Sequence, residues 1–284
     1  MISINNSSPL LRIAVTGITG RMGKKIIEYF LIKKNKQLSK KIILGAAIVR
    51  KNSSICGIDI GTFNKINEFG VKITDNLELI KDDFDTLIDF TAPDISIQYL
   101  NFCVKNNKSI VIGTTGFKQQ HKNIIRNASK TIGVMYSANF SIGIALILKI
   151  LHKITKIIGN NADISIIETH HNKKRDIPSG TAIMMQDLIR DTLQSIQTNK
   201  SINYNLKKRM YPSKQKNIIY DIPIHSIRIG NVVGEHTVLF NILGERLEIT
   251  HKADDRAIFA YGALCAAIWL GCNKKGLFEI HDIL

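Results

Sequence analysis

The sequence predicts an α/β fold with a doubly wound parallel sheet, joined to a second α+β domain that carries an open mixed sheet. In the first half, short apolar runs alternate with segments whose apolar residues recur at helical spacing. Such alternation is typical of a parallel sheet covered by helices on both faces. After about residue 142 the pattern changes to a long amphipathic segment and then to several closely spaced strands. This change indicates a second domain of a different kind.

Five buried strands are predicted in the first half of the chain. Each is a short apolar run followed by glycine or by small, turn-forming residues, as the strands of a buried parallel sheet are. A helix is predicted after the first strand, at residues 24–33. The strands are expected at residues 11–16, 42–48, 85–90, 109–112 and 134–137.

The second half predicts a mixture of helices and strands. Leu247 and Ile249 alternate with polar residues, which predicts a sheet with one wetter face. A last helix, at residues 256–271, is expected to pack back on the first domain. The other expected elements are helices at 144–158 and 182–194, a lysine-rich loop at 195–218, and strands at 163–168, 222–229, 232–239 and 246–251.

The composition is that of an ordinary soluble globular protein, with 44% hydrophobic and 22% charged residues among 284. The net charge of +16 suits a basic nucleotide-sensing or nucleic-acid-binding module, which is one alternative to an enzyme. The basic residues are spread along the chain, without the basic blocks and interleaved aromatic residues of such binders. We therefore expect no nucleic-acid partner.

The cysteines and the apolar runs indicate in which cellular compartment the protein works. Cys56, Cys103, Cys265 and Cys272 show no CxxC spacing, and we expect reduced thiols. The chain opens without a secretory signal, and its longest uncharged run, residues 257–273, is short for a membrane span. These observations predict a cytoplasmic protein with no membrane contact.

A glycine-rich turn follows the first predicted strand and opens a helix. It reads Gly17-Ile18-Thr19-Gly20-Arg21-Met22-Gly23. Glycines at such a turn allow a pyrophosphate to approach the N–H groups of the helix N-terminus. The GxxGxxG spacing departs from the usual GxGxxG, so a tight turn that needs glycine only for packing is the alternative.

Later strand ends favour the nucleotide interpretation, because ligands of open α/β sheets bind at the carboxyl ends of the strands. Gly113-Thr114-Thr115-Gly116 and Ser137-Ala138-Asn139-Phe140 fall at such ends. We predict a Rossmann-type dinucleotide-binding domain at residues 1–141 plus 252–284. Residues 142–251 then form the second domain.

The end of the second strand should select the adenosine ribose of the cofactor. An acidic residue there would bind the 2′-hydroxyl of NADH, but Val49 has no such acceptor. Arg50, with Lys51, can meet a 2′-phosphate. We expect NADPH to be preferred, with NADH possible, although a solvated basic loop is a fair competing explanation.

The segment from Glu168 to Ala182 carries the most chemistry. It holds two adjacent imidazoles, His170 and His171, then three cations, then Pro-Ser-Gly-Thr at the start of an apolar helical run. Imidazoles exchange protons near neutral pH, and N–H groups at a helix start bind carboxylate or phosphate. Taken singly, these are a loop, a solvated basic face and an ordinary helix start. Together they predict a site for a small acidic substrate.

A metal hydrolase that uses His170, His171 and Asp176 is a rival hypothesis. Adjacent histidines rarely point at one metal, and HExxH spacing is absent. The sequence therefore predicts no metal site.

With these motifs in place, the chain resembles the 4-hydroxy-tetrahydrodipicolinate reductase family, also called dihydrodipicolinate reductase, over nearly its whole length. The long central motif is the most specific, and Gly234-Glu235-His236 and residues 245–251 also fit. The matching motifs are Gly17-x-x-Gly20-Arg21-Met22-Gly23, Asp89-Phe90-Thr91-x-Pro93, Gly113-Thr114-Thr115-Gly116, Ala138-Asn139-Phe140-Ser141 and Glu168-x-His170-His171-x-x-Lys174-x-Asp176-x-Pro178-Ser179-Gly180-Thr181-Ala182.

The resemblance implies an NAD(P)H-dependent oxidoreductase of the diaminopimelate route to lysine, which acts on a small dicarboxylate and needs no metal. It also implies a homotetramer assembled by the open sheet of the second domain. Many relatives carry an acidic residue where Val49 stands, and residues 205–225 are more lysine-rich than is usual in the family. The implied roles are proton transfer for His170 and Lys174, substrate binding for His171, Ser179, Gly180 and Thr181, and cofactor binding for residues 17–22, 113–115 and 137–140.

Overall fold

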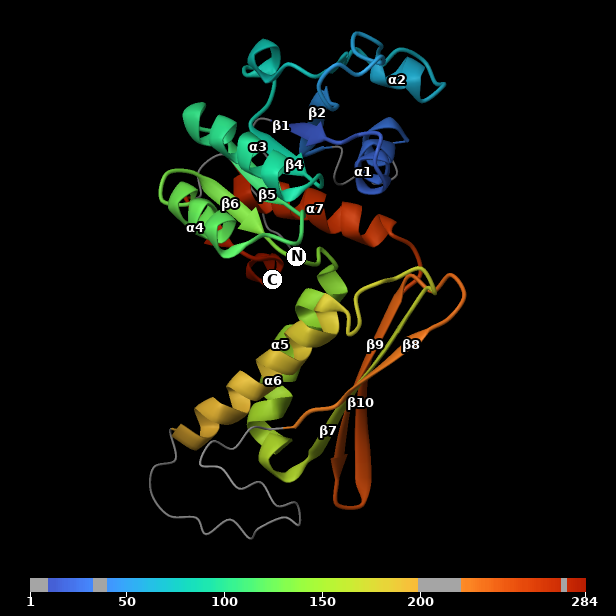
Figure 1. Ribbon diagram of the computed structural model, residues 1–284, viewed down its shortest axis with the longest axis vertical. Coiled ribbons are helices and arrows are strands. Elements are labelled where there is room, and N and C mark those ends of the chain that lie inside the picture. The colour runs from blue at the N-terminus through green and yellow to red at the C-terminus, as the bar shows by residue number, and fades with distance from the viewer. Residues whose placement is uncertain (1–9, 33–39, 199–220, 272–274) are drawn as a thin grey trace. The chain divides into compact units, whose positions relative to one another are not determined.

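The computed structural model describes residues 10–32, 40–198, 221–271 and 275–284. The chain divides into two compact units, residues 1–145 with 255–284, and residues 146–254. Each unit contains its own β-sheet (Figure 1). The expectations for residues 1–9, for Cys272 and for most of the loop at 195–218 lie outside the described residues.

The first unit is built on a seven-stranded sheet in the order β11-β6-β5-β4-β1-β2-β3, in which every neighbouring pair is parallel. The chain runs outward from β1 to β2 and β3, and then returns to the other side of β1 with β4. This reversal creates a switch point at the carboxyl ends of β1 and β4, where open α/β sheets bind ligands. The strands are β1 (Leu11–Thr16), β2 (Ile42–Ile48), β3 (Ile73–Thr74), β4 (Thr86–Asp89), β5 (Ser109–Ile112), β6 (Gly133–Tyr136) and β11 (Gly276–Phe278).

Helices cover both faces of this sheet, because the side chains on each face of its strands are apolar. Ile13 and Val15 of β1 belong to one buried cluster with α1 (Arg21–Leu31) and α7 (Ala257–Leu270). Ala14, between them, belongs to the opposite cluster with α3 (Pro93–Lys105) and α4 (Gln119–Ala128). Two short elements, α2 (Ile60–Phe63) and a 3-10 turn at Leu77–Ile80, connect the strands between β2 and β4.

The last helix packs in the first unit, as predicted. Helix α7 lies against α1, and most of its residues from Ala260 to Leu270 are buried. Its uniformly apolar sequence therefore reflects burial on several sides. Among the described helices, none combines the length and the apolar character needed to cross a bilayer.

The sheet has two strands more than the five predicted. β3 has two residues and β11 has three, so neither is long enough to show the alternation by which a strand is predicted. β11 pairs with β6 at the edge of the sheet.

The second unit carries a four-stranded mixed sheet in the order β10-β9-β7-β8. β9 is antiparallel to both of its neighbours, whereas β7 and β8 run parallel. β8 pairs with β7 at the edge of the sheet, although β9 is the strand that follows β8 in sequence. The elements are α5 (Ile142–Ile158), β7 (Asp163–His170), α6 (Gly180–Thr198), β8 (Ile224–Arg228), β9 (Gly234–Ile242) and β10 (Glu245–Ala253).

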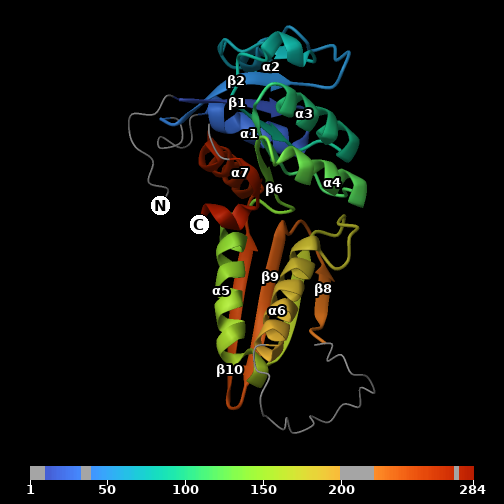
Figure 2. The same cartoon turned by 90° about the vertical axis from the view of Figure 1, so that its left-hand side faces the viewer.

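Helices α5 and α6 run side by side along one face of this sheet (Figures 1 and 2). They are joined by the hydrogen bond between His152 Nδ1 and Thr192 Oγ1, at 3.0 Å. Ile166 and Phe240 are fully buried on the helix-covered face. Leu247 lies opposite Phe240 in the β9–β10 register, so it shares that face, as its alternation with polar residues predicts.

The other face of this sheet carries a mixture of apolar and polar residues. Thr237 and Thr250 are 3.0 Å apart across β9 and β10, and Arg246 forms an ion pair with Glu248 at 2.7 Å. Ile227, on β8, is 47% exposed. Among the described residues of the second unit, no helix lies over this face (Figures 1 and 2).

Candidate active site

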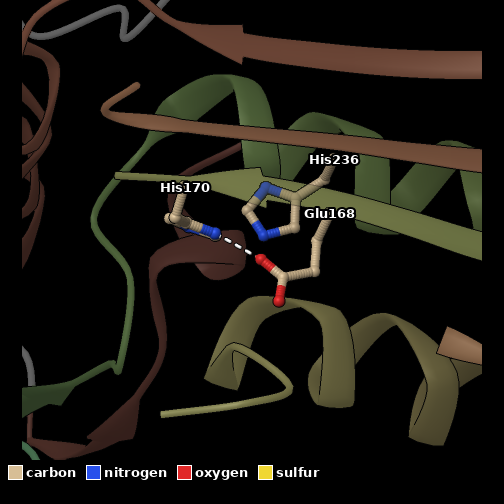
Figure 3. A group of neighbouring side chains, drawn as sticks. All are labelled: Glu168, His170 and His236. Carbon is tan, nitrogen blue, oxygen red and sulfur yellow. Dashed lines mark hydrogen bonds and ion pairs between the residues drawn. The ribbon is translucent and has the colours of Figure 1, made fainter. Parts of the chain in front are cut away.

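His170 is the last residue of β7 and the centre of a buried polar cluster. The alternation of the strand places Glu168 and His170 on the same face, and their exposures are 0% and 7%. Nδ1 of His170 hydrogen-bonds to Oε2 of Glu168. Figure 3 shows the two side chains and His236, from β9, turned towards one another.

Arg228, the last residue of β8, completes this cluster. Its Nη2 lies 2.8 Å from Oε1 of Glu168 and 2.8 Å from the carbonyl oxygen of Asp176. Burial by itself raises the pKa of Glu168, but the hydrogen bonds from Arg228 and His170 outweigh it and lower that pKa. Glu168 is therefore an ionised carboxylate inside the unit, with a donor on each oxygen.

His170 is neutral at rest. Burial lowers its pKa, and the positive charges of Lys174 and Arg228 act in the same direction, against the hydrogen bond and charge of Glu168. A neutral imidazole carries one proton, and the ionised Glu168 can only accept.

His236 faces His170 edge-on, with 5.1 Å between ring centroids. Burial lowers its pKa to about 3, so it too is neutral. Its Nε2 lies 3.0 Å from Oγ of Ser179, and Ser179 Oγ also accepts the N–H of Ala182 at 3.2 Å. Ser179, 2% exposed, thus caps the start of α6 and links it to β9.

The basic residues in the segment between β7 and α6 differ in how far their side chains are exposed. Nζ of Lys174 lies 2.7 Å from Oδ2 of Asp176, and its side chain is only 21% exposed. Lys173 and Arg175 are exposed. His171 is half-buried, and so is Thr181 in the first turn of α6. The structure therefore distinguishes Lys174 from its two basic neighbours.

Gly180 opens α6, and the fold does not demand a glycine there. A Cβ at this position would meet no protein atom within 4 Å. Gly180 is exposed, so the open space beside it is available to a ligand.

The cluster of Glu168, His170 and His236 also tests the metal-hydrolase hypothesis. Their ligand-type atoms all lie within 4.8 Å of one another. Both oxygens of Glu168 and Nε2 of His236 already have hydrogen-bond partners, and the Arg228 guanidinium repels a cation. The chemistry of this donor set suits proton transfer better than metal binding. Among the described residues, the cluster includes neither His171 nor Asp176.

In the first unit, the glycine-rich turn is tight and depends on its glycines. Gly17 has a φ of +59°, and Gly20 N–H donates to Gly17 O at 2.8 Å. A Cβ on Gly23 would lie 2.3 Å from that carbonyl oxygen, so Gly23 is required for packing. Helix α1 has no side-chain cap, which leaves the first-turn N–H groups for an anion. Of the remaining predicted residues, Ile18 is buried, Met22 is half-buried, and Thr19 and Arg21 are exposed.

Several side chains predicted to touch the cofactor have structural roles. Asp89, fully buried at the end of β4, accepts hydrogen bonds from Thr16 at 2.7 Å, Thr91 at 2.7 Å, Thr114 at 3.0 Å and Ser96. This hub joins the carboxyl end of β1 to the segments that follow β4 and β5. Asp89 thus organises these strand ends, a role that the motif alone did not assign.

Aromatic packing explains two further positions near these strand ends. A Cβ at Gly113 would overlap the ring of Phe90, at 2.0 Å, and Phe140 is 2% exposed with its ring edge-on to Phe90 at 5.5 Å. Ser137 Oγ donates to the Asn139 carbonyl at 2.9 Å. Thr115 and Ala138 are exposed and remain candidates for direct contact.

At the end of β2, Val49 and Arg50 have opposite environments. Val49 is 3% exposed and belongs to the core, and its N–H donates to Thr74 O at 3.0 Å. Arg50 is exposed. Val49 is thus a packing residue, and the charge at this strand end comes from Arg50 and Lys51.

Comparison with known proteins matches both units of this chain. The profile described as dihydrodipicolinate reductase, N-terminus, matches residues 11–140, and the profile described as dihydrodipicolinate reductase, C-terminus, matches residues 143–284. A 4-hydroxy-tetrahydrodipicolinate reductase from Blochmanniella pennsylvanica (strain BPEN) is 64% identical over 274 residues, 96% of each chain. The protein of the same name from Blochmanniella floridana is 50% identical over 96% of this chain and 98% of its own.

A solved structure supports the fold. Dipicolinate-bound dihydrodipicolinate reductase from Paenisporosarcina sp. TG-14 superposes with a TM-score of 0.69 at 24% identity, covering 97% of this chain and 100% of that one. A myo-inositol dehydrogenase from Corynebacterium glutamicum shares the fold more distantly, with a TM-score of 0.55 at 13% identity over 94% and 90% of the two chains. With two profile matches that span both units and a relative at 64% identity, the chain belongs to the dihydrodipicolinate reductase family.

Proposed function

We propose that His170 and Lys174 carry out proton transfer in the reaction of this family. That reaction is the reduction of 4-hydroxy-tetrahydrodipicolinate with a nicotinamide cofactor, a step of the diaminopimelate route to lysine. The chain is an NAD(P)H-dependent oxidoreductase of this kind. The buried bond between His170 and Glu168 is the observation that carries the assignment, because it presents a neutral, oriented imidazole beside a cationic loop.

The substrate has two carboxylates, and this segment offers them positive charge and N–H donors. Lys174 is held by Asp176, whose side chain is 58% exposed, so a substrate carboxylate can compete for the ammonium group. The N–H groups at Gly180 and Thr181 open α6, where an anion is favoured. His171 adds a further polar contact. We assign Ser179 to capping this turn, with its backbone part of the substrate cradle.

His170 changes its protonation state during the reaction. A bound dicarboxylate places negative charge nearby, which raises the pKa of an imidazole and favours uptake of a proton. The C4 hydroxyl and a proton from the neighbouring carbon would leave together as water, which gives a C=C bond conjugated with the ring C=N. When bound, the nicotinamide would supply a hydride to C4 of this conjugated system. His170 would then give its proton to the carbon on which negative charge develops, with Lys174 as second donor.

The residues at the strand ends of the first unit fit a nicotinamide dinucleotide. The glycine turn at residues 17–23 would receive the pyrophosphate on the uncapped start of α1. Residues 113–115 and 137–140 would line the remainder. Arg50 would meet the 2′-phosphate, so we propose that NADPH is preferred over NADH.

The open face of the second sheet supports a homotetramer. Apolar residues such as Ile227 share this face with paired polar groups, and an exposed sheet face of this kind favours association with other copies. We place the enzyme in the cytoplasm, where its free thiols Cys56, Cys103 and Cys265 stay reduced.

The proposed function is tested by following NADPH oxidation with freshly generated 4-hydroxy-tetrahydrodipicolinate. Turnover that depends on both compounds supports it, and the absence of turnover in a folded, cofactor-binding protein would refute it. Light scattering of the same sample at micromolar concentration should report four chains per particle, and a monomer would refute the proposed assembly.

A further inference from the structure

Neighbouring side chains hold the ring nitrogen of His170 that faces the interior, Nδ1, in a fixed hydrogen bond. Its Nδ1 contacts Glu168, and Glu168 in turn contacts Arg228. We propose that Glu168, anchored by Arg228, is a positioning residue that holds His170 in the Nδ1–H tautomer and leaves Nε2 to exchange the proton with the substrate. This inference rests on the proposed role of His170 and adds the residues that set its tautomer.

The donor and acceptor chemistry of the three residues permits one arrangement. A guanidinium group has five donors and no acceptor, and it stays protonated. Arg228 is also fixed by the carbonyl oxygens of Asp176 and Ile227, each at 2.8 Å. It therefore occupies Oε1 of Glu168. Oε2 remains as a pure acceptor, so Nδ1 of His170 must be the donor.

The surroundings of Nε2 agree with this assignment. In the part of the chain that the structure describes, Nε2 of His170 has no hydrogen-bond partner. A Cβ at Gly234, on β9, would lie 2.9 Å from it. Glycine at this position therefore keeps a side chain out of the space beside Nε2, where the substrate would have to approach.

Glu168→Gln is the substitution that isolates this effect, because it keeps the shape and changes one acceptor into a donor. Arg228 can only donate, so it will draw the new carbonyl oxygen to itself. The new NH₂ group then faces Nδ1 of His170, which can accept only if its proton moves to Nε2. The variant should therefore hold His170 in the opposite tautomer.

The experiment combines a spectrum with kinetics on the full-length enzyme. Histidine labelled with ¹⁵N distinguishes the two neutral tautomers, and the His170 signal is identified by its loss in His170→Gln. We expect Nδ1–H in the wild type and Nε2–H in Glu168→Gln. We expect kcat of Glu168→Gln to fall roughly 10²–10⁴-fold, the range of a misplaced or missing acid–base group, with NADPH affinity within about twofold.

The matched control is Glu235→Gln. This substitution makes the same chemical change on the opposite face of the sheet, where Oε2 of Glu235 lies 3.7 Å from Nζ of Lys252. We expect kcat of Glu235→Gln to stay within about twofold of the wild-type value. The inference is overturned if the wild-type spectrum shows Nε2–H, a result that does not depend on whether Glu168→Gln folds. It is also overturned if folded Glu168→Gln keeps wild-type kcat. Full activity of His170→Gln would instead refute the role of His170 itself.

Discussion

Oγ of Ser179 lies 3.0 Å from Nε2 of His236, and the two residues are 57 positions apart in the sequence. Both side chains are buried. Burial lowers the pKa of His236 to about 3, so its ring stays neutral and its hydrogen bond with Ser179 does not change over the physiological pH range. Ser179 thus ties the start of α6 to β9, and the backbone N–H groups of that turn are held in place for the substrate.

Ser179→Ala should therefore act on stability and substrate affinity more than on turnover. Loss of an N-cap costs about 1–2 kcal/mol, measurable by urea unfolding, and KM should rise several-fold with kcat nearly unchanged. His236→Gln, which can offer an acceptor to Ser179, should be milder than His236→Leu. A Ser179→Ala enzyme of normal stability but collapsed kcat would show instead that the hydroxyl acts on the substrate directly.

Lys174→Ala and Lys173→Ala should differ sharply although the residues are neighbours. Lys174 is largely buried beside Asp176, whereas Lys173 is exposed. We expect Lys174→Ala to lower kcat/KM by roughly 10²-fold or more, with effects on both kcat and KM, and Lys173→Ala to stay within a few-fold. Steady-state kinetics on both variants decide the matter, since equal losses would favour a diffuse basic patch.

Arg50→Ala should remove most of the cofactor preference. We expect the wild type to favour NADPH by about tenfold in kcat/KM, the size of one exposed charge-assisted contact. The comparison uses both cofactors with one substrate batch at low salt, with Lys51→Ala as the neighbouring control. Equal efficiency of the wild type with both cofactors, or a preference for NADH, would mean that Arg50 points to solvent.

Asp89→Leu should loosen the cofactor site of the first unit. The substitution removes the carboxylate that accepts hydrogen bonds from the buried hydroxyls of Thr16, Ser96 and Thr114. The free energy of unfolding should therefore fall by about 3 kcal/mol or more. Urea unfolding measures the loss, and fluorescence titration should show several-fold weaker NADPH binding. The control is Asp94→Asn in the first turn of α3, whose side chain is 87% exposed. Unchanged cofactor affinity in a destabilised Asp89→Leu variant would limit the hub to a purely structural role.

The parts of the fold and the site that sequence could predict are local. Strand β1, the glycine turn and the segment from Glu168 to Ala182 each consist of neighbouring residues whose spacing carries the signal. β3 and β11 were missed because two or three residues show no periodicity.

The missed contacts are long-range. Arg228 reaches Glu168 from 60 positions away, and His236 reaches Ser179 from 57, so a single sequence holds no pattern that links them. The motif contained Glu168 and His236 but could not show that their side chains converge on His170. The sequence also showed no sign that Gly113 packs against the ring of Phe90, which lies where a side chain at this position would be.

The central claim is that His170 moves the proton in the reduction, and it is tested most directly by His170→Gln beside the wild type. The measurement is turnover of NADPH with freshly generated 4-hydroxy-tetrahydrodipicolinate, with NADPH affinity measured separately by fluorescence. We predict turnover lower by roughly 10²–10⁴-fold, with the fold and NADPH affinity retained. A His170→Gln enzyme that turns over near the wild-type rate would contradict the account, because His170 would then be only a structural part of its buried cluster.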